Sequence, residues 1–555
     1  MTRRLALIAT FMAATALSLW LWWRDGQLVR PPDAPPGKLD CVSYTPSHDQ
    51  ALTLTSVIKR EQMAHDLKLL AGRFRCVRIY SVGNGLDQIP GVARELGLRV
   101  LLGLWIGPDP VLNQKEIRLG LAVAASNMDV IEGVIVGNEV LLRRELTAEQ
   151  LGRLIRQVNS ATDVPVTYAD VWDFWKANPE LAADVNFVTI HLLPYWDDKP
   201  TGIDAALAHT ATVYAEARAT FPDKRVFIGE TGWPSQGRQR VDAAPGNLSQ
   251  ARFVREFTSW AQRNGIEYNL IEAFDQPWKR AQEGTVGGYW GMYDAHGTPK
   301  FPLQGPLAED PEWLRGFWGA GAGALLLLAA GFAGARRLGR PDSLLLIFAG
   351  AAGGSVAVMQ WRYLSTSNRN LTEWCASVAI ALVGWVLYAW ILLALSGRRS
   401  RLKLPAPESI FETLGSFDHR ELNPRPANPG RSRSLGVLRF ALLLGFAYVC
   451  LGLAVDSRYR GFPTCLYVMP VIAISLLSLL DRSGRTLRFY LMPEETLLAA
   501  LAGLCSVVIA INEGPANLPA LGLAGLALAF ACSLLIPASR LARDDQQAEQ
   551  HANHG

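Results

Sequence analysis

Long apolar runs begin the chain and recur throughout its second half. The first run covers residues 5–23 and follows Arg3 and Arg4. Seven further runs come after residue 315, at residues 316–335, 343–361, 374–396, 435–455, 461–480, 496–512 and 518–537. A helix of about 20 apolar residues crosses the hydrocarbon core of a bilayer. The pattern therefore predicts eight transmembrane helices, one at the start of the chain and seven after residue 315.

The first run ends in Trp20, Trp22 and Trp23, which are side chains that favour a membrane interface. A cleaved signal peptide has a shorter apolar core and a small-residue cleavage site. An uncleaved anchor is therefore the preferred interpretation of residues 1–23. Either interpretation carries the following segment across the membrane.

Basic residues mark one side of the predicted spans. Arg and Lys gather before the first run and after the second, fourth, sixth and eighth runs. Because cytoplasmic segments carry an excess of Arg and Lys, both termini are predicted in the cytoplasm, with residues 24–315 on the periplasmic side of the inner membrane. Arg439 lies in the fifth run, one turn from its cytoplasmic end. Snorkelling of its side chain is the simpler interpretation, and a functional charge is the alternative.

The segment between the first two runs has a different pattern. Its start, residues 24–38, is rich in proline, which favours an extended spacer. Beyond it, short β-rich apolar runs alternate with amphipathic stretches such as residues 147–159 and 248–264. The predicted strands cover residues 41–44, 76–80, 100–104, 134–136, 166–169, 185–191, 226–229 and 270–274.

Eight strand–helix units in about 265 residues fit an α/β fold, the (β/α)8 TIM barrel. A doubly wound sheet is the alternative, although no glycine-rich phosphate loop follows the first strand. The predicted domains are, in chain order, an anchor at residues 1–23, a linker at 24–38, the barrel at 39–305, seven transmembrane helices at 316–539 and a polar cytoplasmic tail at 540–555.

Composition agrees with a membrane protein. Hydrophobic residues make up 50% and charged residues 19% of the 555 residues, whereas soluble domains have about 25% charged residues. The 54 basic and 50 acidic residues give a net charge of +4, which is too small for a general nucleic-acid-binding field. We therefore expect a lipid bilayer, and no nucleic acid, among the partners.

Two carboxylates stand where predicted buried strands end. Glu139 follows the fourth strand and Glu230 follows the seventh. The catalytic residues of a TIM barrel lie at this end of the strands. Cleavage of a glycosidic bond uses such a pair, because one carboxylic acid protonates the leaving oxygen while the other attacks the sugar or activates water.

Three motifs stand at the ends of predicted strands two, four and seven: VRIY at 77–80, VGNE at 136–139 and GETGWPS at 229–235. Over residues 39–303 they resemble glycoside hydrolase family 17, whose members act on β-1,3-glucans. The resemblance implies a retaining mechanism with Glu139 as acid/base, Glu230 as nucleophile and Asn138 at the sugar 2-hydroxyl. With its polytopic C-terminal half, the chain is similar to bacterial membrane-bound glucan transglycosylases.

The chain departs from this resemblance near predicted strand eight. Gln276 stands where plant members would have glutamate, so hydrogen bonding beneath the catalytic pair is expected to differ. Asp275, Lys279 and Glu283 are therefore candidates for supporting residues around the site.

Other strand-end residues have two interpretations each. Arg78 and Tyr80, in predicted strand two, are candidate substrate-binding or supporting residues, and Arg78 either forms a structural ion pair or keeps the nucleophile ionised. His191 is either a core histidine or a neighbour of Glu230. Aromatic rings near strand ends are either glucose platforms or packing residues, in about equal shares; these are Tyr44, Trp105, Tyr168, Trp172, Trp175, Tyr195, Trp196, Trp233, Trp278, Tyr289 and Trp290.

The cysteines show no metal-binding spacing. Cys41 and Cys76 begin neighbouring predicted strands on the side of the membrane where disulfides persist, so they either form a bridge or remain free. The five others lie in or at the predicted spans. We predict neither a metal nor a cofactor, because no His/Cys cluster is present.

Transglycosylation of β-1,3-glucan, by elongation, branching or cyclisation, is the predicted function. A hydrolytic endo-β-1,3-glucanase and a non-enzymatic glucan-binding or export partner are the alternatives. A sugar-nucleotide polymerase is disfavoured, since the longest predicted cytoplasmic loop, residues 397–434, is too short for a nucleotide-sugar domain. A glucan synthase or exporter is an open additional partner.

Overall fold

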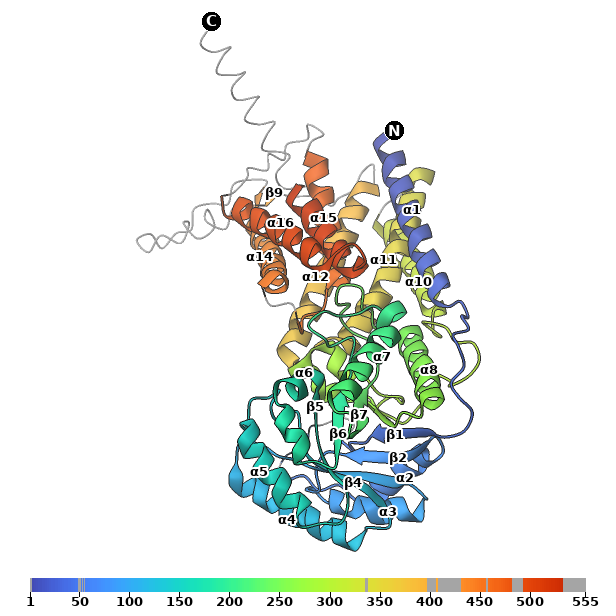
Figure 1. Cartoon of the computed structure of the whole chain (residues 1–555). Helices are drawn as coiled ribbons and strands as arrows, with labels where there is room; N and C mark the ends of the chain where they lie inside the picture. The colour runs from blue at the N-terminus through green and yellow to red at the C-terminus, as the bar shows by residue number, and fades with distance from the viewer. Residues whose placement is uncertain are drawn as a thin grey trace, which may run out of the picture. The chain divides into compact units, whose positions relative to one another are not determined.

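The computed structural model describes residues 2–47, 51, 53, 55–334, 338–396, 406–407, 431–455, 458–481 and 493–532. Two compact units are present (Figure 1). One is Leu28–Glu309, and the other combines Met1–Gln27 with Asp310–Gly555. The predicted tail at residues 540–555 lies outside the described residues.

The first unit contains a closed barrel of eight parallel strands in sequential order. The strands are β1 (Leu39–Ser43), β2 (Phe74–Ile79), β3 (Arg99–Leu104), β4 (Ile131–Asn138), β5 (Val166–Val171), β6 (Phe187–His191), β7 (Arg225–Thr231) and β8 (Tyr268–Leu270). Strand β8 pairs with β1 and closes the ring. The predicted barrel is confirmed, and the doubly wound alternative is wrong.

Helices connect the strands and lie outside them (Figure 1). They are α2 (Arg60–Ala71), α3 (Ile89–Glu95), α4 (Pro110–Ser126), α5 (Ala148–Asn159), α6 (Trp172–Ala177), α7 (Ile203–Thr220), α8 (Asn247–Asn264) and α9 (Arg280–Glu283). Short 3-10 turns are η1 (Leu86–Gln88), η2 (Pro179–Ala183), η3 (Pro277–Lys279) and η4 (Thr285–Gly288).

Helix α5 shows how the sequence specifies these elements. Thr147 and Gln150 form a capping box that satisfies backbone donors at its first turn. Leu151, Ile155 and Val158 recur at helical spacing and are buried. The helix therefore begins at a polar cap and packs one apolar face against the barrel core.

A small apolar cluster fills the interior of the barrel. Seven strands contribute one buried residue each, namely Cys41, Cys76, Leu101, Ile135, Ala169, Phe187 and Phe227. Because the members come from β1 to β7 and contact one another, they form a layer across the barrel. This layer closes the barrel beneath the strand ends that carry the polar residues.

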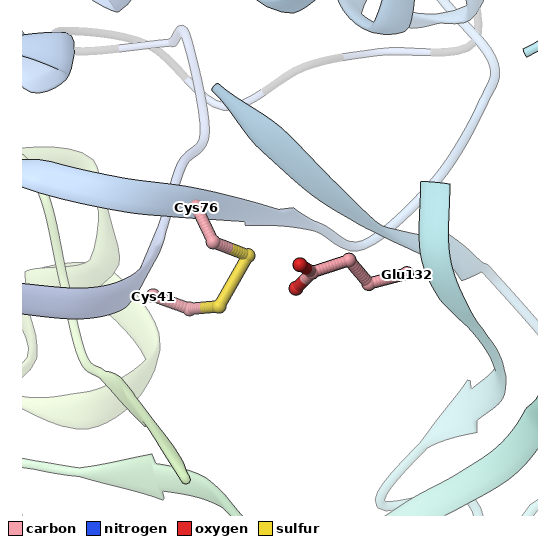
Figure 2. A group of neighbouring side chains, drawn as sticks. All are labelled: Cys41, Cys76 and Glu132. Carbon is pink, nitrogen blue, oxygen red and sulfur yellow. A yellow bond between two sulfur atoms is a disulfide. The ribbon is translucent and has the colours of Figure 1, made fainter. Parts of the chain in front are cut away.

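A disulfide joins Cys41 and Cys76 within this layer (Figure 2). The two residues are paired in the register of β1 and β2, with Cα atoms 4.3 Å apart. The bridged interpretation of these cysteines is therefore confirmed. Glu132 lies close to the bridge (Figure 2) and pairs with Arg75 at 2.9 Å and with Arg99 at 3.1 Å.

The last strand differs from its predicted position. Residues 270–274 were expected to form it, but β8 covers Tyr268–Leu270. Beyond Leu270 the Ile271 N–H still donates to the Thr231 carbonyl at 2.9 Å and the Ala273 N–H to the Ser43 carbonyl at 2.8 Å, whereas the Glu272 N–H donates to the Trp290 carbonyl at 3.2 Å. The carboxylate of Glu272 thereby falls just after the strand and not within it.

The second unit is helical. Its helices are α1 (Thr2–Asp25), α10 (Leu314–Gly334), α11 (Arg340–Thr366), α12 (Leu371–Ser396), α14 (Arg433–Val455), α15 (Thr464–Asp481), α16 (Pro493–Glu513) and a helix at Leu518–Cys532. Two-residue strands β9 (Ala406–Pro407) and β10 (Arg431–Ser432) pair in parallel.

Six of these helices are long and apolar enough to cross a membrane. They lie in α1, α10, α11, α12, α14 and α16. Two shorter apolar helices, Thr464–Leu476 and Leu518–Cys532, fall in the regions of the predicted sixth and eighth spans. The count of eight spans stays a prediction, since only six candidates meet the length requirement within the described residues.

Glycines allow α10 and α11 to approach closely. A Cβ on Gly354 would lie 2.0 Å from the Gly319 carbonyl oxygen, and one on Gly323 would lie 2.2 Å from the Gly350 carbonyl oxygen. Only a residue without a side chain fits at such contacts, which is typical of helix pairs in membranes.

Arg439 does not snorkel. Its side chain is buried, and it donates from Nε and Nη2 to the two carboxylate oxygens of Glu495 at 2.8 and 2.6 Å. The predicted snorkelling is wrong because a carboxylate on α16 provides a bidentate partner inside the unit.

Candidate active site

The polar residues predicted at strand ends meet at the C-terminal end of the barrel. Arg78 is in β2, Asn138 ends β4, His191 ends β6 and Glu230 is in β7, while Glu139 directly follows β4. These strands are buried along their length, so their carboxyl ends bring side chains from distant sequence positions together.

Glu230 is held by two donors. The Tyr80 hydroxyl donates to Glu230 Oε1 at 2.8 Å, and Arg78 Nη1 donates to the same oxygen at 3.2 Å. Arg78 Nη1 also donates to the Gly229 carbonyl at 2.7 Å. Arg78 and Glu230 are both buried, so their ion pair is shielded from water. Burial and the Glu230 charge raise the pKa of Tyr80, which keeps its hydroxyl protonated as a donor.

Arg78 also orients Asn138. Its Nη2 donates to Asn138 Oδ1 at 2.5 Å, and its guanidinium lies 4.7 Å from the centre of the Tyr80 ring. One buried cation therefore organises the ends of β2, β4 and β7. Arg78 forms an ion pair with Glu230, a contact that is compatible with both interpretations of Arg78.

Glu139 has a left-handed backbone, with φ of +53°. Gly137, two residues earlier, has φ of +85°, and a Cβ there would lie 2.7 Å from a methyl group of Val140. This turn ends the strand and turns the chain at Glu139. The Glu139 side chain is partly accessible, at 23% exposure, whereas Glu230 is at 5%.

His191 stands between the two carboxylates. Its Nδ1 lies 2.9 Å from Glu139 Oε1, and its Nε2 lies 3.7 Å from Glu230 Oε1. Burial opposes ionisation of Glu139, but the hydrogen bond and charge of His191, with the charges of Arg143 and Arg78, lower the pKa of Glu139 overall. The predicted proximity of His191 to Glu230 is present, and the closer contact is to Glu139.

The two glutamates are close to each other. One oxygen of Glu139, one oxygen of Glu230 and a nitrogen of His191 all lie within 4.8 Å of one another. Such a group has the residue types of a metal site, yet the Arg78 guanidinium already pairs with Glu230. A fixed positive charge at this position opposes a bound cation.

The loop after β8 holds buried charges. Lys279 Nζ donates to Glu272 Oε2 at 2.8 Å, and Gln276 Nε2 donates to the same oxygen at 2.9 Å. Burial raises the pKa of Glu272 to about 7. Burial also raises the pKa of Glu283, and the charges of Glu139 and Glu230 add to this effect.

Asp275 belongs to a neighbouring pair. It accepts a hydrogen bond from Lys300 Nζ at 2.7 Å and one from the Gly291 N–H at 2.8 Å. Burial raises its pKa to about 6. Asp275 therefore supports the loop, and no described contact joins it to the two glutamates.

Sequence reasoning missed Glu272 and Asp170. Glu272 is a lone charge within the apolar stretch 270–274, a pattern that signals a buried carboxylate. Asp170, in β5, accepts a hydrogen bond from the Tyr168 hydroxyl, and burial raises its pKa to about 6. It lies near the carboxyl end of β5, directly after the predicted strand 166–169, so its position was the available signal.

Tyr195 and Trp233 are packing residues. The Tyr195 hydroxyl donates to the Arg238 carbonyl at 2.6 Å, and Trp233 Nε1 donates to the Ala244 carbonyl at 3.0 Å. Both side chains are fully buried, with Trp233 packed at an angle against Phe253. Neither ring has an open face for a sugar, so the structure favours the packing interpretation of these two rings.

The other candidate aromatics divide by exposure. Tyr44, Tyr168, Trp172, Trp175, Tyr289 and Trp290 are buried. Trp196 and Trp278 are half-buried, whereas Trp105 is 45% exposed. Trp105 is therefore the aromatic of this group with the most accessible ring.

A closed parallel barrel with paired glutamates at the ends of β4 and β7 is the arrangement of a glycoside hydrolase. Residues 41–291 match the family described as the BtgE/BtgC glycoside hydrolase domain. This match falls on the barrel and includes both glutamates.

Relatives of the chain are named as β-1,3-glucan enzymes. The chain is 28% identical over 254 residues to a glucan 1,3-beta-glucosidase of Arthroderma benhamiae, covering 42% of this chain and 82% of the relative. It is 28% identical over 262 residues to a glucan 1,3-beta-glucosidase of Schizosaccharomyces pombe, covering 43% and 79%. Both are fungal proteins, so they do not test the predicted bacterial membrane-bound type.

A solved structure with similarity is an active-site mutant of Rhizomucor miehei beta-1,3-glucanosyltransferase in complex with laminaritriose. It is 23% identical, with a TM-score of 0.43, and the match covers 49% of this chain and 98% of that chain.

Proposed function

We propose that the barrel is a retaining enzyme that cleaves β-1,3-glucan and transfers the released glycosyl group to another sugar. The observation that carries the proposal is the pair of glutamate oxygens within 4.8 Å of each other. Retaining enzymes have carboxyl groups about 5 Å apart, whereas inverting enzymes leave about 6.5–9.5 Å for a water.

Glu230 is the nucleophile in this proposal. Tyr80 and Arg78 both donate to Glu230 Oε1, so Oε2 is the atom that attacks the anomeric carbon. The bond from this carbon to the leaving oxygen breaks as the ester to Glu230 forms. Asn138 uses its amide oxygen to bind Arg78, which directs its amide nitrogen to donate to the sugar 2-hydroxyl.

Glu139 is the acid and then the base. A proton shared between Glu139 Oε1 and His191 Nδ1 passes to the leaving oxygen as the glycosidic bond breaks. In the second half-reaction Glu139 takes a proton from the incoming hydroxyl, whose oxygen attacks the anomeric carbon. Glu230 leaves as a carboxylate, so the anomeric configuration is retained.

Hydrolysis is the second candidate, favoured by the glucosidase names of the two relatives. Water is present at about 55 M, so a sugar acceptor must gain effective molarity by binding beside the glycosyl-enzyme. Attachment to a membrane favours transfer, because it would place the enzyme where an exported glucan emerges.

We infer that the barrel acts on the periplasmic side of the cytoplasmic membrane, as in the bacterial membrane-bound type. Six candidate spans and the distribution of basic residues support this location. The Cys41–Cys76 disulfide also supports it, since disulfides persist in oxidising compartments. A glucan synthase or exporter is the proposed class of additional partner.

Product analysis tests the proposal. The purified full chain is incubated with one β-1,3-gluco-oligosaccharide, and the products are measured by mass spectrometry over time. Transfer predicts products longer than the starting chain. Exclusively shorter products at all substrate concentrations up to the millimolar range would support the hydrolase instead.

A further inference from the structure

Trp105 is an accessible aromatic side chain at the catalytic end of the barrel. It is the first residue beyond β3, and β3 pairs with β4 up to the Leu104–Val136 pair. Its N–H donates to Glu116 Oε1 at 3.1 Å, and the same oxygen accepts from the Val82 N–H at 2.8 Å. The backbone of Trp105 is therefore fixed while its ring remains 45% exposed.

The Trp105 ring rests on Arg143. The guanidinium carbon lies 4.4 Å from the ring centre, which is a cation–π contact. Arg143 is itself held by the Asn138 carbonyl, the Ile106 carbonyl at 2.9 Å and Glu145 Oε2 at 2.6 Å. A side chain with three partners presents a rigid plane, so one face of the ring is supported by a fixed group.

Arg143 connects this ring to Glu139. The Arg143 N–H donates to the Glu139 carbonyl at 2.8 Å, and the Arg143 charge helps to lower the pKa of Glu139. The Arg143 guanidinium also donates to the carbonyl of Asn138, the residue before the acid/base glutamate, while it lies over the Trp105 ring. A glucosyl ring stacked on Trp105 would therefore lie at the catalytic end of the barrel.

We propose that Trp105, supported by Arg143, binds a glucosyl unit of the β-1,3-glucan chain by stacking. The proposal rests on the proposed glucan activity and adds a binding subsite to it. β-Glucosyl rings have apolar C–H faces that pack on aromatic rings, while their hydroxyl groups remain at the edge in water. An exposed indole on a fixed support suits such a ligand because little side-chain freedom is lost on binding.

Binding to an inactive full-length protein tests the subsite. In a Glu230→Gln background, calorimetry measures the affinity for β-1,3-gluco-oligosaccharides of two to seven units. Trp105→Ala should weaken binding of the longer oligosaccharides about tenfold, whereas Trp105→Phe should stay within about threefold of the parent. Met128→Ala is the matched control, because Met128 is 49% exposed and precedes β4 at the opposite end of the strand. Equal affinities of Trp105→Ala and the parent for every length would overturn the proposal.

Footprinting tests the same subsite without a substitution at Trp105. A β-1,3-gluco-oligosaccharide should slow hydroxyl-radical oxidation of Trp105 in the unsubstituted protein, and an α-1,4-gluco-oligosaccharide should not. Unchanged oxidation would overturn the proposal. If the protein neither cleaves nor extends glucan, the proposed activity fails, whereas binding and footprinting still decide the role of Trp105.

Discussion

The contact between His191 and Glu139 sets the pH range in which Glu139 holds a proton. His191 Nδ1 lies 2.9 Å from Glu139 Oε1, and the interaction lowers the pKa of Glu139 despite burial. A hydrogen bond to a charged group contributes about 1.5–3 kcal/mol, and one pKa unit corresponds to about 1.4 kcal/mol. His191→Phe removes both the donor and the charge, so the ionised form of Glu139 should lose about 1.5–3 kcal/mol of stabilisation and the pKa of Glu139 should rise.

The sign of this effect follows from the acid role of Glu139. Activity falls at high pH because the acid loses its proton. A raised pKa of Glu139 therefore moves the alkaline limb of the pH profile to higher pH. His191→Asn provides a neutral donor in place of Nδ1, and its limb should lie between those of His191→Phe and the unsubstituted protein. The maximal rate falls in both variants, since the carboxylate loses its orientation.

The assay is the pH dependence of kcat/KM for cleavage of a β-1,3-gluco-oligosaccharide. Tyr80→Phe is the control, because Tyr80 contacts Glu230 and not Glu139. Its alkaline limb should stay in place even though its rate falls. An alkaline limb that does not move in His191→Phe would refute the role of His191 at Glu139.

Three further outcomes follow from the structure and the sequence. Glu139→Ala should slow cleavage, and azide should restore part of the rate with an activated substrate and yield a β-glycosyl azide; the absence of this adduct would argue against the acid/base assignment. Alkaline phosphatase fused after Leu303 should be active, and fused after Leu402, which lies outside the described residues, it should be inactive; activity at both points would contradict the topology. Glu495→Gln leaves Arg439 buried without the Glu495 carboxylate and should lower the free energy of unfolding of the helical unit by about 3–5 kcal/mol. The double variant Arg439→Leu with Glu495→Leu should recover much of this loss, as measured by thermal unfolding. Equal melting temperatures of Glu495→Gln and the unsubstituted protein would contradict the last prediction.

The fold was predictable because its strands are buried and regularly spaced. Each predicted strand overlaps an observed one, and the largest displacement is at β8, which ends at Leu270. The apolar pattern identifies such strands, but it does not show at which residue a regular strand ends. At β8 this depends on a contact distant in sequence, the hydrogen bond from the Glu272 N–H to the Trp290 carbonyl.

The site was predictable in part for a similar reason. Strand ends at one edge of the barrel brought Arg78, His191, Glu139 and Glu230 together as the motif positions indicated. The buried carboxylate of Glu272 was missed, because its environment includes Lys279 and Gln276 from the loop after β8. Side-chain burial of this kind is a tertiary property that no local pattern contains.

Aromatic and charged residues were the least predictable. Local sequence places a tryptophan near a strand end, but it does not reveal whether neighbouring loops cover the ring. Trp233 is buried by Phe253, whereas Trp105 is exposed above Arg143. Arg439 likewise pairs with Glu495, which lies on a helix distant in sequence, so the local pattern did not indicate this ion pair.

Trapping of the glycosyl-enzyme tests the central claim most directly. A 2-deoxy-2-fluoro-β-glucosyl donor with a good leaving group forms the covalent intermediate and slows its breakdown, and peptide mapping by mass spectrometry locates the attached sugar. The proposed mechanism predicts one fluoroglucosyl group on Glu230, and none in Glu230→Gln. A label on another residue, or turnover to a product of inverted anomeric configuration with no covalent adduct, would contradict a retaining mechanism that acts through Glu230.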